Sequence, residues 1–146
     1  YLYMALLNEG PALDIKSTFS VGQSIKAFHT AFKCPRNKSF QGLPAETVND
    51  AELLVLRKSL IREEVEELFE SLDKGNEADI LKELVDIVVV CVGMADTYGW
   101  DFDEAFKRVH ESNMSKLNDK GQPIYRKDGK VLKSENYVPP DLQDLV

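Results

Sequence analysis

The sequence is poor in cysteine and has no long apolar run. Its 146 residues include two cysteines, Cys34 and Cys91, too few for the disulfide framework that stabilises small secreted domains. Nowhere do about 18 apolar residues follow one another, the length that a membrane-spanning helix needs, and no basic leader precedes an apolar stretch near the first residue. These absences predict a soluble protein of the reducing cytoplasm that does not insert into a membrane.

Positive charge is also scarce. Eighteen Lys and Arg residues stand against 25 Asp and Glu residues, a formal net charge of −7. Nucleic acids and anionic membrane surfaces would be repelled, so we expect neither as a sequence-independent partner. Hydrophobic residues make up 43% of the chain, which is enough for a packed core, and the length suits one domain. We place that domain at residues 20–146, after an irregular lead-in at 1–19 without sustained periodicity.

Apolar residues recur at intervals of three and four along four stretches, which is the period of amphipathic α-helices. Between the second and third stretches, Gly75 suits a helix C-cap and Asn76 suits the N-cap of the next helix. We expect Asn49 or Asp50 to cap the second helix, and Asp101 to cap the fourth. The predicted helices span about 20–34, 50–74, 77–98 and 102–118.

The stretch "IVVVCV" at 87–92 is ambiguous, because its β-branched residues also favour strands. Its apolar positions continue the helical spacing of the preceding "DILKEL" without a breaker, so we predict a helix. A helix that is apolar on nearly every side is buried on nearly every side. In a chain of four helices, this indicates packing against a second copy. We therefore predict an all-α four-helix bundle that assembles as a homodimer or homotetramer.

The C-terminal part lacks this helical spacing. "IYRKDGKVL" has Asp128 and Gly129 at the position of a two-residue turn, which predicts a short β-hairpin. "VPPDL" follows and predicts an extended tail.

An acidic window occupies residues 62–86, where ten acidic residues accompany three basic ones. If the two helices form an antiparallel hairpin about Gly75, Glu67 and Glu83 each lie eight residues from the turn, and Glu64 and Asp86 each lie eleven. At about 1.5 Å per residue, each pair is level across the hairpin. A solvated face is the ordinary explanation of helical charge, and we retain it for the remaining acidic residues, Glu66, Glu70, Asp73, Glu77 and Asp79.

Four carboxylates at close quarters repel one another unless a cation joins them. Lys82 alone cannot balance them, whereas a divalent cation can. Oxygen ligands without neighbouring Cys or His suit Mg²⁺, with Mn²⁺ as the alternative, rather than Zn²⁺. Glu63 borders the same face as Glu64 and Glu67, so it is either a further ligand or, like Glu64, a base that activates water.

The pattern "EEVEE", then fifteen residues, then "ELVD" resembles the carboxylate motif of the MazG-like all-α nucleoside triphosphate pyrophosphohydrolases. This superfamily also contains the phosphoribosyl-ATP pyrophosphohydrolases. The segments "VGQSIKAFHTAF", "LRKSLIREEVEEL", "HESNMSKL" and "GKVLKSENYVPPDL" are similar to successive parts of the phosphoribosyl-ATP pyrophosphohydrolase-like subgroup, so the resemblance covers about residues 20–142.

The resemblance implies cleavage of a nucleoside triphosphate between its α- and β-phosphates, which gives a monophosphate and pyrophosphate. It implies that Asn113 and Lys116 contact phosphate oxygens, and that the first helix lines the nucleobase pocket. His29 and Phe32, with Phe28, are the candidates for that pocket; for the two Phe residues core packing is the alternative, and a lone His is often a bystander.

Arg126, Lys130 and Lys133 form a basic patch in the predicted hairpin that can close over the phosphates, from a neighbouring subunit if the chain oligomerises. Simple solvation of these side chains is the alternative. The function predicted is a Mg²⁺-dependent (d)NTP pyrophosphohydrolase of house-cleaning or dUTP/dCTP type. Phosphoribosyl-ATP hydrolysis and a non-catalytic helical adaptor that binds metal or nucleotide remain as alternatives.

Overall fold

The computed structural model describes residues 19–146 as four α-helices, one short 3₁₀ helix and their connecting loops. The elements are α3 (Val21–Ala31), α4 (Val48–Lys74), α5 (Glu77–Thr97), α6 (Phe102–Met114) and the 3₁₀ helix η1 (Gln143–Leu145). These elements confirm the all-α prediction, and the ambiguous apolar run at 87–92 is helical. The irregular lead-in was predicted at residues 1–19. Residues 1–18 lie outside the described part of the chain.

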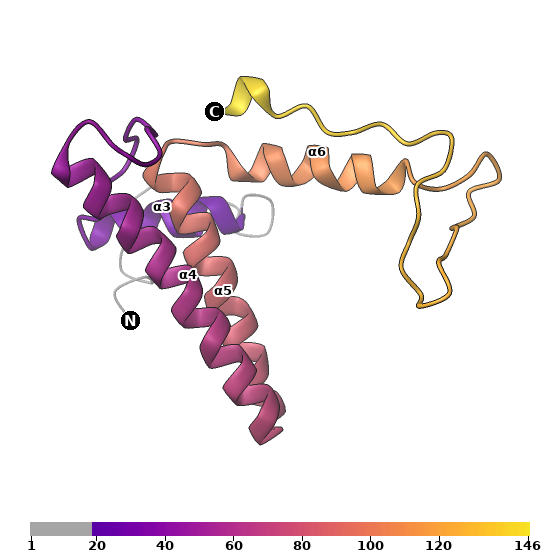
Figure 1. Cartoon of the computed structure of the whole chain (residues 1–146), viewed down its shortest axis with the longest axis horizontal. Helices are drawn as coiled ribbons and strands as arrows, with labels where there is room; N and C mark the ends of the chain where they lie inside the picture. The colour runs from indigo at the N-terminus through magenta and orange to yellow at the C-terminus, as the bar shows by residue number, and fades with distance from the viewer. Residues whose placement is uncertain (1–18) are drawn as a thin grey trace.

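The helices α4 and α5 form an antiparallel hairpin with a very short turn (Figure 1). Gly75 has a φ of 76°, a left-handed conformation that suits glycine, and its N–H donates to the carbonyl oxygen of Ser71 at 3.0 Å. The Asn76 side-chain oxygen then accepts from the N–H groups of Ala78 and Asp79 at 3.0 and 3.2 Å. Both predicted caps are confirmed, and together they set the register of α5 against α4.

Three helix ends differ from the prediction. α3 stops at Ala31, whereas the prediction extended it to about residue 34. The Thr47 hydroxyl accepts a hydrogen bond from the Asp50 N–H at 3.1 Å, so Thr47, and not Asn49 or Asp50, is the N-cap of α4. At the other end of the chain, α6 stops at Met114 instead of reaching Asn118. The Asn118 side chain instead accepts hydrogen bonds from two backbone N–H groups in the turn that follows it.

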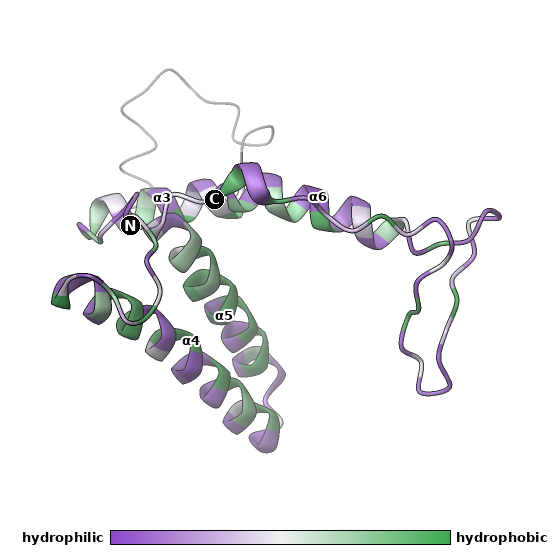
Figure 2. Ribbon diagram, turned by 45° about the horizontal axis from the view of Figure 1, so that its top comes forward, coloured by the Kyte–Doolittle hydropathy of each residue, from purple (hydrophilic) through white to green (hydrophobic). Residues whose placement is uncertain are grey.

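The four helices do not form a compact bundle within one chain. α4 and α5 pack along each other, α3 lies against α5, and α6 meets α3 and α5 at few positions. Figures 1 and 2 show α6 running away from the α4–α5 hairpin, with the C-terminal tail returning beside it. The Ser112 hydroxyl donates to the carbonyl oxygen of Val138 at 2.7 Å, and the Arg108 guanidinium binds the Asp144 carboxylate; both contacts hold the tail on α6.

The prediction of a C-terminal β-hairpin with two strands is wrong. Between residues 19 and 146 there is no strand, and Tyr125 and Val131 form one isolated antiparallel bridge. The connecting loop has three residues rather than two, since the Arg126 N–H donates to the Lys130 carbonyl at 2.8 Å, and Gly129 has a φ of 87°. Both arms are exposed, and an isolated pair of strands is marginally stable in water.

The buried apolar core lies where α3, α4 and α5 meet. It contains Ile25, Leu54, Val92, Ala95 and Tyr98. Further along the hairpin toward its turn, large apolar side chains are exposed in the single chain, as the green segments of α4 and α5 in Figure 2 indicate: Phe69, Leu72, Leu81, Leu84, Val85 and Val88. No helix within residues 19–146 is long and apolar enough to cross a membrane.

Candidate metal centre

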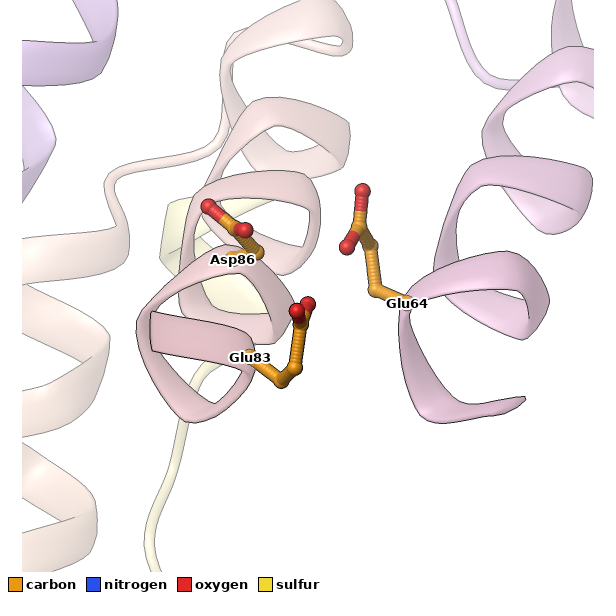
Figure 3. A group of neighbouring side chains, drawn as sticks. All are labelled: Glu64, Glu83 and Asp86. Atoms are coloured by element: carbon orange, nitrogen blue, oxygen red, sulfur yellow. The ribbon is translucent and has the colours of Figure 1, made fainter. Parts of the chain in front are cut away.

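Three of the four predicted metal ligands gather between α4 and α5. Glu64 projects from α4, and Glu83 and Asp86 project from successive turns of α5 toward it (Figure 3). One oxygen from each carboxylate lies within 4.8 Å of the others. The cap residues at the turn produce this proximity, because they place the two helices in the register at which these positions are level.

Glu67 and Glu63 are placed differently. Both side chains are exposed, and neither belongs to the group of converging oxygens. Glu67 still acts on the centre through its charge, since it contributes to the raised pKa of Glu64. Glu63 directly precedes Glu64 on α4.

The centre is partly buried and crowded with negative charge. Glu83 is 7% exposed, and the Oε2 atoms of Glu83 and Glu64 are buried without a hydrogen-bond partner among the described residues. Burial raises the pKa of Glu64, and the charges of Asp86, Glu67 and Glu83 raise it further. Buried carboxylate oxygens rarely lack a partner, so the arrangement calls for a positive ligand.

One ammonium group reaches these carboxylates. Lys82 Nζ lies 2.8 Å from Asp86 Oδ2 and 3.1 Å from Glu83 Oε1. The hydrogen bond with Asp86 raises the pKa of Lys82 most, and the hydrogen bond with Glu83 raises it further. One ammonium cannot neutralise three carboxylates, and it leaves both buried Oε2 atoms without a partner.

The residues present fit a hard divalent cation. Ligand distances of about 2.1 Å for Mg²⁺ allow opposite oxygens to be about 4.2 Å apart, and the longer bonds of Ca²⁺ allow about 5 Å. The observed spread of 4.8 Å is on this scale. Carboxylate oxygens are the donors that Mg²⁺ and Mn²⁺ prefer, whereas Zn²⁺ favours nitrogen and sulfur. Glu64, Glu83 and Asp86 would hold such an ion, which would supply charge neutralisation at a phosphate group.

The predicted phosphate-binding residues lie elsewhere in the chain. Asn113 and Lys116 are at the end of α6, where Lys116 Nζ donates to Asn113 Oδ1 at 2.9 Å. Arg126 binds the Asp128 carboxylate, and Lys130 is exposed in the same loop. Figures 1 and 2 show this end of α6 and its loops lying away from the α4–α5 hairpin. A single chain therefore does not bring these residues to the carboxylates.

The predicted base-pocket residues divide into two environments. Phe28 and Phe32 are exposed, with ring centroids 4.8 Å apart. His29 is 3% exposed, and its Nδ1 donates to Asp96 Oδ2 at 2.8 Å. The Arg36 guanidinium binds the same carboxylate with two nitrogens at 2.8 and 3.0 Å. His29 is therefore part of a buried polar network and not a bystander.

Sequence reasoning missed most of this network. Beside the network lies Arg57, whose charge lowers the pKa of His29; Arg57 is 6% exposed, and its Nε has no hydrogen-bond partner among residues 19–146. A signal was available, because Asp96 is a single carboxylate in an otherwise apolar stretch of a helix, "VGMADTYG". A charge in such a place needs a partner from another element.

The fold and the centre define an all-helical protein with a carboxylate site suited to a hard divalent cation. Sequence comparison identifies its family: residues 25–113, more than half of the chain, match the family model described as phosphoribosyl-ATP pyrophosphohydrolase, and the chain belongs to this family. This confirms the resemblance to the MazG-like superfamily. The description of the family names a pyrophosphohydrolase, which is a hydrolase.

A viral protein is also similar. The chain is 28% identical over 127 residues to "Uncharacterized protein L479" of Acanthamoeba polyphaga mimivirus. The aligned region covers 85% of this chain and 47% of the viral protein, so the chain spans about half the length of that relative.

Proposed function

We propose that this protein is a Mg²⁺-dependent nucleoside triphosphate pyrophosphohydrolase that converts a (d)NTP to the (d)NMP and pyrophosphate, as a house-cleaning enzyme or one of dUTP/dCTP type. The observation that carries the proposal is the converging carboxylate centre with two buried, unpartnered oxygens. Such a centre suits a ligand that arrives with divalent cations, as a triphosphate does. Phosphoribosyl-ATP is the second candidate substrate, because the family model carries its name.

In the proposed reaction, Glu64, Glu83 and Asp86 hold the metal, and Glu67 adds negative charge beside them. A divalent cation bound there would neutralise charge that develops on the phosphates. Glu63, or Glu64 if it is not engaged as a ligand, takes a proton from the attacking water. The water oxygen bonds to the α-phosphorus, the bond from that phosphorus to the bridging oxygen breaks, and pyrophosphate leaves.

The site is proposed to be completed by a second copy of the chain, in a homodimer or homotetramer. Two observations support this. The end of α6 and the loops after it, the segment that contains Asn113, Lys116, Arg126 and Lys130, lie away from the α4–α5 hairpin. The hairpin also exposes a run of large apolar side chains. Phe32 remains a candidate for contact with the nucleobase, whereas His29, buried and bound to Asp96, does not. The free thiols of Cys34 and Cys91 are consistent with a cytoplasmic location.

The test is a substrate panel with a matched pair of variants. The full chain is incubated with Mg²⁺ and ribo-, deoxyribo- and modified nucleoside triphosphates and with phosphoribosyl-ATP, and the products are resolved by chromatography. We expect a monophosphate product and pyrophosphate. Glu64→Gln keeps the shape of the side chain but removes a ligand charge, and turnover should fall about 100-fold or more.

Glu66→Gln is the control, because Glu66 is exposed on another face of the same helix and should be dispensable. Release of diphosphate and phosphate would contradict the proposal, as would full turnover by Glu64→Gln. Preference for phosphoribosyl-ATP over all triphosphates would select the second candidate.

A further inference from the structure

Lys82 occupies an unusual position relative to the carboxylate centre. It precedes Glu83 and lies one helical turn before Asp86, so its side chain reaches both carboxylates from the same helix. The ammonium is 3.1 Å from Glu83 Oε1 and 2.8 Å from Asp86 Oδ2. Of the three converging carboxylates, it therefore binds the two that α5 supplies.

The contacts of the Lys82 ammonium with Glu83 and Asp86 can be replaced by contacts with another cation. The Lys82 side chain is 62% exposed, and its long stem can turn outward without disturbing the core. By contrast, Glu83 is almost fully buried and cannot leave the centre. A cation placed among Glu64, Glu83 and Asp86 would bind the same two carboxylates that now bind the ammonium, so the two positive charges would compete for Glu83 and Asp86.

We propose that Lys82 is a built-in counter-ion of the metal centre, and that a divalent cation binds by displacing its ammonium from Glu83 and Asp86. Loading is then an exchange of one cation for another. The inference rests on the proposed function only in that the same three carboxylates hold the metal. It assigns Lys82 a positioning role, which lowers metal affinity and keeps the metal-free hairpin closed.

Two opposite effects follow from this assignment. Removing the ammonium should make divalent cations bind more tightly, because no contact must be broken first. The same change should make the metal-free protein less stable, because the carboxylates then repel one another without compensation. A residue with a merely structural role would lower stability without improving metal binding.

The experiment compares the wild-type protein with Lys82→Gln and with Lys58→Gln, which removes one exposed charge from α4 outside the group of converging carboxylates. Mn²⁺ binding is measured by calorimetry without nucleotide, and thermal unfolding is measured in EDTA. Working at about 0.5 M salt shortens the range of charge effects to about 4 Å, so that only local competition remains. We expect three- to tenfold tighter Mn²⁺ binding and a lower melting temperature in EDTA for Lys82→Gln alone.

A second measurement uses the wild-type protein. An amine-acylating reagent followed by mass spectrometry reports how freely Lys82 reacts, and saturating Mg²⁺ should increase its acylation several-fold while leaving Lys58 unchanged. Equal or weaker Mn²⁺ binding by Lys82→Gln, or Lys82 acylation that does not rise with Mg²⁺, would overturn the proposal. Neither experiment measures nucleotide turnover. Failure of the cation exchange can therefore be distinguished from failure of the proposed enzyme activity.

Discussion

At the scale of single residues, Asp96 joins three elements of the fold. Its carboxylate, 5% exposed, accepts from His29 on α3 and from Arg36 in the loop that leads to α4. Burial alone would raise the pKa of Asp96, but the hydrogen bonds from Arg36 and His29 outweigh it and lower that pKa. Burial lowers the pKa of His29, the Asp96 hydrogen bond opposes this, and the nearby Arg57 charge adds to the lowering.

We predict that Asp96→Asn destabilises the protein by about 3 kcal/mol, because it leaves partly buried donors without a charged acceptor. Urea unfolding followed by circular dichroism measures the loss. Asp128→Asn breaks the exposed pair with Arg126 and is the control, with an expected cost below about 1 kcal/mol. Equal effects of the two variants would show that the buried network has no special role.

The same two groups define a pH dependence. His29 has a folded pKa below its ordinary value of 6.5, so its contribution is fully present above pH 6.5 and is lost as the pH falls toward the folded pKa. Asp96, with a folded pKa below 3.8, loses its contribution below that pH. Acidification should therefore destabilise the network in two steps, and Asp96→Asn should abolish the second.

At the scale of elements, close approach between α3, α4 and α5 depends on Gly93. A Cβ at this position would lie 3.1 Å from Arg57 Nη1 and 3.2 Å from His29 Nε2. His29 cannot retreat easily, because Asp96 holds its ring from the other side. The glycine is thus required for packing, although glycine is a poor residue for the interior of a helix.

Gly93→Ala should therefore lower stability by about 1 kcal/mol, even though helix propensity alone predicts a gain of about 1 kcal/mol. Chemical denaturation of four proteins, the wild type, Gly93→Ala, His29→Ala and the double variant, isolates the contact. In the His29→Ala background only the contact with Arg57 Nη1 remains, and the space left by the imidazole lets that side chain shift, so the penalty of Gly93→Ala should shrink or reverse. The same penalty in both backgrounds would locate the strain elsewhere.

At the scale of the whole molecule, the single chain is open. α6 and its tail extend away from the α4–α5 hairpin (Figure 1), and the hairpin leaves Leu81 and Val85 63% and 53% exposed. These two residues are four apart and share a helix face. Contiguous apolar surface of this kind is the usual signature of an interface, which agrees with the proposed association of copies.

Replacing both residues with lysine, Leu81→Lys and Val85→Lys together, should convert the proposed oligomer to a monomer, because it places two charges in an apolar interface. Analytical ultracentrifugation reports the mass, and turnover should fall with it if a second copy completes the site. Val146→Lys, an equally exposed apolar position at the chain end, is the control. A wild-type protein that is already monomeric would contradict the proposal.

Much of the fold and part of the centre were predictable from local patterns. Helical spacing predicted the four helices, and Gly75 and Asn76 predicted the turn that makes Glu64 level with Asp86. The predicted β-hairpin failed because a turn signal at Asp128 and Gly129 does not supply the neighbouring surface that strands need. The predicted end of α6 was also wrong, because the Asn118 side chain accepts a hydrogen bond from the Lys120 N–H in the following turn instead of ending the helix.

The sequence by itself determined the helical elements, the caps at the turn between α4 and α5, and the carboxylates that share a helix face, because each depends on residues close together along the chain. Only the tertiary structure decided that Glu67 stays outside the converging group and that Asp96 joins His29 to Arg36. The position of Glu67 depends on the direction of its side chain. The Asp96 contacts join residues that are 60 or more positions apart in the sequence. No local pattern carries that information, since burial and partner are set by how the elements pack.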